Sequence, residues 1–220
     1  ALVVGAAACG GSGDDQGADG RPVTVRLIAH DSFAVSDGVL EGFTERTGIE
    51  VEVIKGGDAG TVVNQAILTN GNPQADVLFG IDSTLLTSAL REDLFVPYES
   101  GALAEVEPAH LLDEKHRVTP VDYGDVCLNY DKAWFAERGL AVPDSLDDLV
   151  RPEYQDLLVV ENPATSSPGL AFLLSTIDHF GEDGWQEWWR GLRSNGVQVV
   201  GDWEAAYYGA FSGGSTSEGD

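Results

Sequence analysis

The sequence predicts an α/β protein of two lobes, and the second of these lobes is expected to be incomplete. In residues 23–90, short apolar runs that are typical of buried parallel strands alternate with helical patterns. A long extended segment follows at residues 118–130, and it contains Pro120 and Gly124. We expect this segment to cross from one lobe to the other. The sequence then ends in a turn at residues 211–215, before a second lobe of similar size could be completed.

The first lobe is predicted to contain three strands, each followed by a helix. The strands are expected at residues 23–30, 49–54 and 75–80, and the helices at residues 37–47, 61–68 and 82–90. Gly48 should end the first helix, because glycine adopts the left-handed backbone of a helix end at little cost. Ligands of parallel sheets bind beyond the carboxyl ends of the strands. Three polar turns fall there and predict a cleft: His30-Asp31-Ser32, Gly57-Asp58 and Asp82-Ser83.

The second lobe is expected to be built around a turn between a buried strand and a helix. Residues 157–160 are a continuous apolar run, and residues 161–167 are a polar turn. Ser166 or Ser167 fits the N-cap of the helix, and Pro168 fits its first position, where the missing N–H costs nothing. The free N–H groups and the positive dipole end of such a helix suit an anion such as a phosphate. An ordinary turn whose serines cap only their own helix explains the same residues.

Further elements and several aromatic residues follow in this lobe. Helices are expected at residues 131–138, 143–149 and 184–193, a strand at residues 197–200, and a last helix from about Asp202. Trp185, Trp188 and Trp189 lie inside an amphipathic helix and are predicted to pack in a core. Trp203 stands just after a strand, where it could stack on a flat ring, with an extra gain of roughly 0.5–2 kcal/mol for a cationic ring. A tryptophan at a helix start is more often structural, so this position alone assigns no ligand.

The composition limits the possible functions. The 220 residues are 43% hydrophobic, which suffices for one large domain or two small lobes. The 12 basic and 37 acidic residues give a net charge of −25, so the protein would repel a nucleic-acid backbone. This charge is compatible with a cationic ligand, although a solvated acidic surface accounts for most of it.

The first residues resemble the end of a bacterial lipoprotein signal. Residues 1–8 are apolar and small, Cys9 follows them, and residues 10–20 are a Gly- and Asp-rich tether. We expect Cys9 to be the lipidated first residue of the mature protein, although Ala6 stands where leucine is usual. The sequence contains no methionine, so the initiator is expected to lie outside it. These features predict a signal-peptide remnant, lipidation motif and tether at residues 1–20, a first lobe at residues 21–120, and the crossover with the incomplete second lobe at residues 121–220.

Signatures of common enzymes and metal sites do not occur in the sequence. It contains neither a G-x-S-x-G turn nor a P-loop. None of the four histidines lies four residues from another, so a metal site is not supported. Cys127 has no partner if Cys9 is lipidated, and its apolar neighbours predict that it is a small buried residue.

Five sequence motifs occur in a fixed order between residues 23 and 212: H-D-S-F, A-D-V-L-F-G-I-D, V-D-Y-G-D-V-C-L-N-Y-D-K, N-P-A-T-S-S-P-G-L-A-F-L-L and G-D-W-E-A-A-Y. Together they resemble the thiamine-binding periplasmic proteins, the substrate-binding subunits of thiamine ABC importers. The pieces T-S-x-P-G-L and W-x-x-A-Y are the most specific. The resemblance implies a two-lobed periplasmic-binding-protein-like fold, truncated here in its second lobe, that closes on thiamine or its phosphates.

The resemblance also implies how such a protein works. It would deliver its ligand to an ABC permease, act as a monomer without cofactor or nucleic acid, and catalyse no reaction. It would reside at the cell surface or in the periplasm, held to the outer face of the plasma membrane only by the lipid on Cys9. Two alternatives stay open. One is the same fold with a ferric ion or a polyamine as ligand, and the other is a secreted hydrolase, for which no nucleophile–base motif is present.

The resemblance assigns site residues position by position. Ser166 and Ser167 would take polar or phosphate groups of the ligand, and Trp203 would stack against it. Asp58 and Ala59 would hold its pyrimidine side. The same cleft is expected to include His30, Asp31, Asp82 and Tyr207. Some family members have glycine where Ala59 stands and tyrosine where His30 stands, and the family uses a tyrosine-containing strand beyond residue 220.

Overall fold

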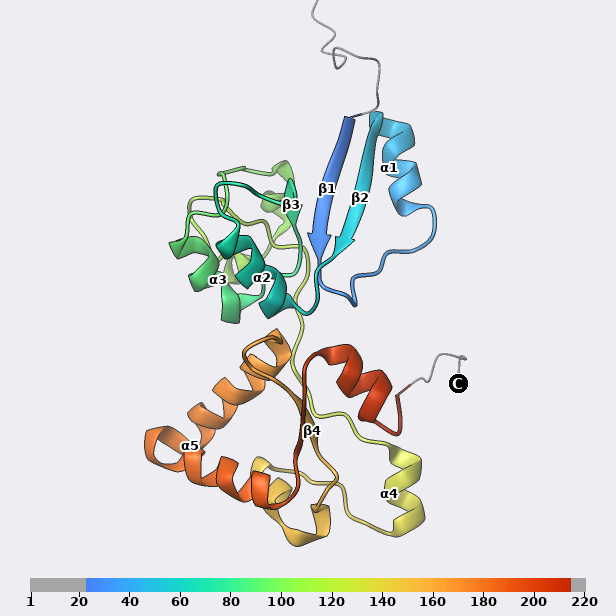
Figure 1. Cartoon of the computed structure of the whole chain (residues 1–220), viewed down its shortest axis with the longest axis vertical. Coiled ribbons are helices and arrows are strands. Elements are labelled where there is room, and N and C mark those ends of the chain that lie inside the picture. Colours follow the sequence, from blue (N-terminus) through green and yellow to red (C-terminus); the bar gives the residue numbers. More distant parts are fainter. Residues whose placement is uncertain (1–22, 215–220) are drawn as a thin grey trace, which may run out of the picture.

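The structure is a computed structural model that describes residues 23–214. These residues form two lobes joined by an extended segment (Figure 1). The first lobe contains a three-stranded sheet in the order β2-β1-β3, and the second contains a two-stranded sheet of β4 and β5. The predicted α/β class and two-lobed arrangement are therefore confirmed. The predictions for residues 1–20, including the lipidation of Cys9, lie outside the described residues.

The first lobe is a parallel sheet with helices packed against it. β1 (Val23–Ala29) pairs along its whole length with β2 (Ile49–Lys55) and near its end with β3 (Val77–Leu78). α1 (Val39–Thr47) packs against β2, whereas α2 (Ala59–Leu68) contacts both β1 and α3 (Ser83–Arg91) (Figure 1). Two short 3-10 helices follow, η1 (Gly101–Glu105) and η2 (Pro108–His110). In Figure 1, the carboxyl ends of β1 and β2 point toward the second lobe.

Local sequence signals explain where most of these elements begin and end. Gly48 ends α1 in the left-handed conformation, with φ of 72°, as predicted. The third strand is shorter than expected, because only Val77 and Leu78 pair as a strand. The backbone N–H of Phe79 still donates to the Ile28 carbonyl at 2.9 Å, but Gly80, with φ of 107°, then turns the chain out of the sheet. The predicted strand of six residues is therefore shorter at both ends, and Gly80, its expected last residue, already lies outside the sheet.

The second lobe is smaller in its sheet and richer in helix. β4 (Val159–Glu161) and β5 (Gln198–Val200) pair in parallel. The helices are α4 (Lys132–Arg138), the 3-10 helices η3 (Leu146–Val150) and η4 (Pro152–Tyr154), α5 (Ser167–Ser194) and the π-helical η5 (Ala205–Ala210). Gly181, with φ of 71° and ψ of 174°, interrupts α5, so the expected tryptophan-rich helix is its second half. The helix expected at residues 143–149 is instead the short η3, which is capped by Ser145.

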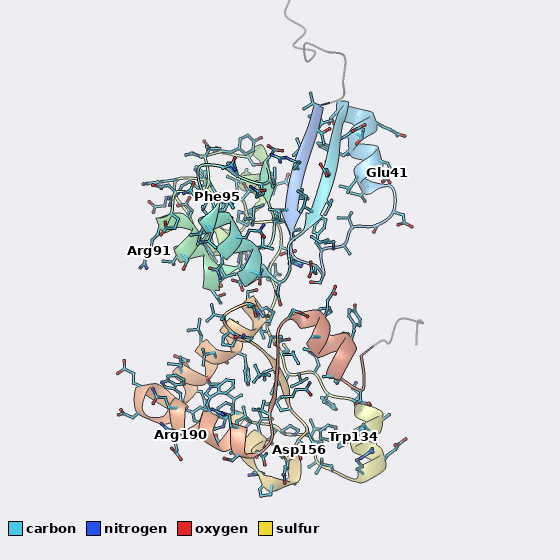
Figure 2. All side chains as sticks on the ribbon, viewed as in Figure 1. Glu41, Arg91, Phe95, Trp134, Asp156 and Arg190 are labelled. Carbon is cyan, nitrogen blue, oxygen red and sulfur yellow. The ribbon has the colours of Figure 1, made fainter. Side chains whose placement is uncertain are left out.

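The core of this lobe lies between α5, η3 and β4. Its buried members are apolar and come from all three elements: Leu149, Val160, Phe172, Trp188 and Leu192. The indole N–H of Trp188 donates to the Leu146 carbonyl at 3.1 Å, so its one polar atom is paired. The prediction that Trp188 packs in a core is confirmed. Figure 2 shows that Trp134, by contrast, lies on α4 at the end of this lobe that is remote from the first lobe.

The segment that connects the lobes is extended and exposed. Residues 118–130 contribute to no strand among the described residues, and Tyr123 is 82% exposed. Cys127 is exposed as well, so the prediction that it is buried is wrong. The physical reason is that no described strand pairs with this apolar run or covers it. An apolar run alone indicates that a segment can be buried, and a partner must be present to bury it.

Candidate functional site

Asp58 stands at the carboxyl end of β2 and joins the two lobes. It is the N-cap of α2, and its Oδ1 accepts a hydrogen bond from the Ala59 backbone N–H at 2.6 Å. Its Oδ2 accepts a second hydrogen bond from the backbone N–H of Trp203, at 3.0 Å. Two residues that are 145 positions apart in the sequence therefore meet at the boundary between the lobes.

Trp203 belongs to an aromatic cluster at the start of the last helical segment. Its ring stacks on Tyr207, with ring centroids 4.8 Å apart and an angle of 9° between the planes. The ring of Tyr208 meets Trp203 edge-on at 5.4 Å. Trp203 itself is half-buried. Tyr207 therefore backs one face of the indole, which leaves a rigid aromatic surface next to Asp58.

The side chains around Asp58 and Trp203 enclose a small depression between the lobes. Its lining comes from the carboxyl end of β1 and the turns that follow β2 and β5: Asp31, Ser32, Asp58, Asp202, Trp203 and Glu204. Its volume of about 10 Å³ is roughly that needed for one water molecule. The two lobes are in direct contact at this depression, and it has no room for a ligand larger than a water molecule.

The turn after β1 is fixed to the turn after β2. The Asp31 backbone N–H donates to the Gly57 carbonyl at 2.9 Å, and the Gly57 N–H donates to the Asp31 carboxylate at 3.0 Å. His30 lies beside them, with its Nδ1 2.8 Å from the Ser32 hydroxyl and its ring 5.8 Å from that of Phe79. The structure therefore brings Asp31 to the depression and places His30 directly next to it.

Ser166 and Ser167 lie at the N-terminus of α5, which faces the N-terminus of α2. The Ser166 hydroxyl accepts a long hydrogen bond from the Gly169 N–H at 3.5 Å, and the residue is only 1% exposed. Ser167 is buried as well. In this conformation Ser166 caps its own helix, and neither serine lines the depression. The two N-termini do meet, because the Thr61 N–H donates to the Thr165 carbonyl at 3.2 Å.

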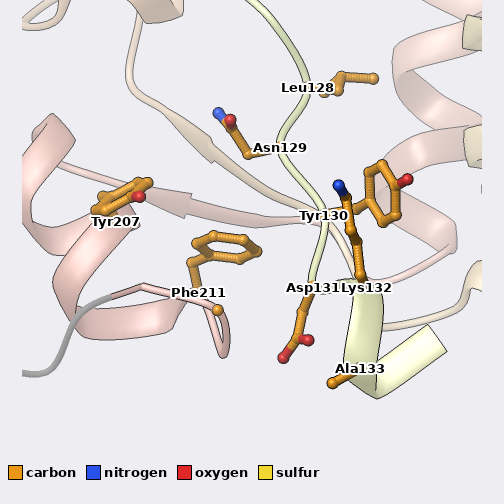
Figure 3. A pocket seen from close by; sticks show the side chains of 9 residues that line it. Leu128, Asn129, Tyr130, Asp131, Lys132, Ala133, Tyr207 and Phe211 are labelled. Atoms are coloured by element: carbon orange, nitrogen blue, oxygen red, sulfur yellow. The ribbon is translucent and has the colours of Figure 1, made fainter. Parts of the chain in front are cut away.

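Asp82 and Tyr207 lie away from the depression. Asp82 is the N-cap of α3, and its Oδ1 accepts from the Thr84 N–H at 3.0 Å, the Leu85 N–H at 3.2 Å and the Thr84 hydroxyl at 2.7 Å. Tyr207 lines a larger cavity of about 510 Å³ on its other side, between the connecting segment and η5 (Figure 3). This cavity is bounded by Leu128, Asn129, Tyr130, Asp131, Lys132, Ala133, Tyr207, Phe211 and Gly213.

Three residues at the lobe boundary were not predicted from the sequence: Gly60, Glu161 and Thr165. A Cβ at Gly60 would lie 2.6 Å from the Thr165 carbonyl oxygen, so only glycine allows this approach without a shift. Burial raises the pKa of the Glu161 carboxyl above its ordinary value, and the negative charge of Asp58 raises it as well. Glu161 directly follows the apolar run of β4, so the rule that sites lie at carboxyl ends of strands could have found it.

The described residues contain carboxylates and an aromatic face at the lobe boundary but no cluster of the usual metal-ligating side chains. Within residues 23–214, no three His, Cys, Asp or Glu side chains are grouped so that they could hold a metal. The boundary instead combines an aromatic face with the carboxylates of Asp31 and Asp58. In the same part of the chain, no helix has the length and apolar character needed to cross a bilayer.

Curated proteins and solved structures resemble this chain. It is 30% identical over 191 residues to the thiamine-binding periplasmic protein of Escherichia coli (strain K12). This match covers 85% of this chain and 56% of that protein. It is 27% identical over 197 residues to the thiamine-binding periplasmic protein of Brucella suis, with 88% and 57% covered. A solved periplasmic thiamin binding protein superimposes with a TM-score of 0.65 at 24% identity, covering 84% of this chain and 57% of that structure. Iron-bound HitA from Pseudomonas aeruginosa superimposes with a TM-score of 0.61 at 25% identity, covering 81% and 56%.

These comparisons establish the fold and the family. The chain spans a little more than half the length of the curated relatives it matches, and its second lobe is truncated relative to theirs. The family described as bacterial extracellular solute-binding protein matches residues 72–216, which is most of the chain. The chain therefore belongs to the family of bacterial extracellular solute-binding proteins.

Proposed function

We propose that the full-length protein is an extracytoplasmic solute-binding protein that captures thiamine or thiamine phosphates and delivers them to an ABC permease. The observation that carries this proposal is the meeting of the Trp203 segment with Asp58 at the lobe boundary, through a hydrogen bond of 3.0 Å. The similarity to thiamine-binding periplasmic proteins supports the choice of ligand. In this proposal the protein acts as a monomer, needs no cofactor and catalyses no reaction.

The chemistry of thiamine fits the groups at this boundary. Thiamine combines a cationic thiazolium ring with a flat aminopyrimidine. The face of an indole ring can stack on both rings of thiamine. The quadrupole of the indole also attracts the positive charge of the thiazolium ring. The carboxylates of Asp31, Asp58, Asp202 and Glu204, which line the depression, supply a negative field for the cation. Because the depression now has room for about one water molecule, we infer that the ligand enters while the lobes are apart.

One titration tests the proposal against its alternatives. Full-length protein is titrated with thiamine, thiamine diphosphate, spermidine and Fe(III), and each mixture is then checked for conversion of the ligand. Saturable binding of thiamine or its diphosphate without conversion is the expected result. Preferential binding of Fe(III) or spermidine would show that thiamine is not the ligand. Conversion of a bound compound would show that the protein is an enzyme. Fe(III) is included in the titration because the chain is 26% identical over 163 residues to the Fe(3+)-binding periplasmic protein of Serratia marcescens.

Ser166→Ala should weaken thiamine phosphates more than thiamine. The hydroxyl and the first turn of α5 would face the phosphate when the lobes are apart, whereas the rings of thiamine would contact Trp203. The two affinities are measured by calorimetry on the same variant. Ser145→Ala is the matched control, because Ser145 caps η3 with a similar hydrogen bond, 3.3 Å from the Asp148 N–H. Equal losses for both ligands would contradict a phosphate role for Ser166.

Cys9→Ser should release the full-length protein from the membrane fraction and leave thiamine affinity unchanged. We propose that residues 1–20 hold the end of a signal peptide, the lipidation motif and a tether, so that Cys9 carries the only anchor. Residues 21–120 and 121–220 would then be the two lobes that it tethers. The measurement is fractionation of a bacterium that expresses the precursor, and Cys127→Ser serves as the control. Continued membrane association of Cys9→Ser would argue against a lipoprotein.

A further inference from the structure

The turn that follows β1 carries two residues that line the depression, Asp31 and Ser32. This turn opens the loop of residues 30–38, which joins β1 to α1. A loop has no helix or strand ladder of its own, so its conformation depends on contacts with neighbouring elements. The contacts that fix this loop therefore decide where the Asp31 carboxylate and the Ser32 hydroxyl stand.

Lys55 holds this turn from the neighbouring strand. It is the last residue of β2, and it is exposed. Its ammonium donates to the Asp31 carbonyl at 2.5 Å and also to the Phe33 carbonyl. The same ammonium lies 5.7 Å from the centroid of the Phe33 ring, which adds a cation–π attraction. Two carbonyl oxygens thus converge on one positive charge, and Ser32 lies in the chain between them.

The convergence of the two oxygens explains why a cation stabilises the turn. Carbonyl oxygens that approach the same point repel each other, because each carries a partial negative charge. A positively charged donor between them replaces this repulsion by attraction, and hydrogen bonds from a charged donor are about twice as strong as neutral ones. An apolar side chain of similar length would leave both oxygens without this donor. We therefore expect the turn to loosen when the ammonium of Lys55 is removed.

Two further contacts fix the ends of the turn, and Lys55 joins them. At the first end, the Gly57 N–H donates to the Asp31 carboxylate at 3.0 Å. At the second end, the Phe33 ring packs edge-on against Phe79, with 5.0 Å between the ring centroids. Lys55 contacts the carbonyls of both Asp31 and Phe33, so it links the end that is tied to β2 with the end that rests on the chain after β3.

We propose that Lys55 is a positioning residue for the ligand site, whose ammonium clamps the turn after β1 and so holds Asp31 and Ser32 in the depression. The role in ligand binding rests on the proposed function, whereas the clamp itself does not. Lys55 has the same charge as the thiazolium ring of thiamine. Electrostatic repulsion alone therefore predicts that thiamine binds more tightly once this charge is removed. Loss of a positioning contact predicts the opposite, weaker binding.

The test compares two substitutions of Lys55 in full-length protein. Lys55→Met keeps an unbranched side chain and loses both the charge and the donors. Lys55→Arg keeps a positive charge and several donors, so it can still bind two carbonyl oxygens. Lys115→Met is the matched control. Lys115 is also exposed, but it lies beyond η2, so its replacement removes the same charge at a position remote in the sequence from the turn.

Hydrogen exchange in ligand-free protein measures the clamp. The amides of Asp31 and Gly57 report on it, because they donate between the two turns at 2.9 Å and 3.0 Å. Both amides should exchange about tenfold faster in Lys55→Met, as expected for loss of a charge-assisted hydrogen bond. They should exchange at the normal rate in Lys55→Arg and Lys115→Met. Unchanged exchange at the centre of β1 in every variant shows that the fold is intact.

Thiamine affinity gives the second readout. Thiamine should bind about tenfold more weakly to Lys55→Met at both low and high salt, because salt screens a charge effect but does not restore a lost position. Lys55→Arg should recover most of the affinity, and Lys115→Met should bind thiamine as the unmodified protein does.

Three results would overturn the proposal. Unchanged exchange of the two amides in Lys55→Met would show that Lys55 does not hold the turn. Tighter thiamine binding by Lys55→Met would show that Lys55 acts through its charge alone. Faster exchange with unchanged affinity would show that the clamp has no role in the ligand site. If the unmodified protein does not bind thiamine, the proposed function fails, and hydrogen exchange still decides the clamp.

Discussion

Gly169→Ala should lower the free energy of unfolding of the second lobe by about 3 kcal/mol, the upper end of what overpacking usually costs. Gly169 lies in the first turn of α5 and is buried against the end of β4. A Cβ at this position would be 2.5 Å from the Glu161 carbonyl oxygen and 2.9 Å from its carbonyl carbon. Both atoms belong to the backbone of a strand, so neither can move away by changing a rotamer. The helix would have to separate from the sheet.

The same substitution elsewhere in α5 should have the opposite sign. A Cβ at Gly191 would be 3.5 Å from the nearest atom, a methyl group of Val150, which is ordinary contact. Gly191→Ala should therefore stabilise the lobe by about 0.5–1 kcal/mol, because alanine is the better helix former. Hydrogen exchange of α5 and β4 amides at increasing urea reports on this lobe separately from the other. Equal stability of the two variants would show that α5 does not pack closely on β4.

The predictions that succeeded depended on signals carried within a few residues. Gly48 ends α1, and Ser166 caps α5. Each of these features follows from the need of helix ends for hydrogen-bond partners or for a left-handed residue. The alternation of strands and helices likewise predicts the parallel sheet. Such requirements are local, so the sequence alone is sufficient.

The features that were missed depend on how distant segments meet. The contact between Gly60 and Thr165 joins residues from different lobes, and no periodicity in either segment indicates it. The two bonds of the Asp58 carboxylate were missed for the same reason, since a capping aspartate and a ligand carboxylate look alike in sequence. Cys127 was predicted to be buried because its neighbours are apolar, but exposure depends on a partner segment.

The aromatic residue at the boundary should carry a large share of ligand affinity. Trp203→Ala should weaken thiamine binding by about 1–3 kcal/mol, through lost apolar contact and lost attraction of a cationic ring. The alanine keeps the backbone N–H that donates to Asp58 at 3.0 Å, so the contact between the lobes can persist. The loss of affinity can then be assigned to the ring. Trp203→Phe should recover most of it, because phenylalanine restores an aromatic face.

Trp134→Ala is the matched control for this measurement. Trp134 lies on α4, remote from the lobe boundary (Figure 2). The guanidinium of Arg138 lies over its ring, 4.0 Å from the centroid. Its removal should leave thiamine affinity unchanged in the same calorimetric titration. Normal binding by Trp203→Ala would contradict a stacking role and remove the main physical support for thiamine as the ligand. An equal loss in both variants would instead indicate damage to the second lobe as a whole. A loss confined to Trp203→Ala, with recovery in Trp203→Phe, is the pattern that an aromatic ring in contact with the ligand requires.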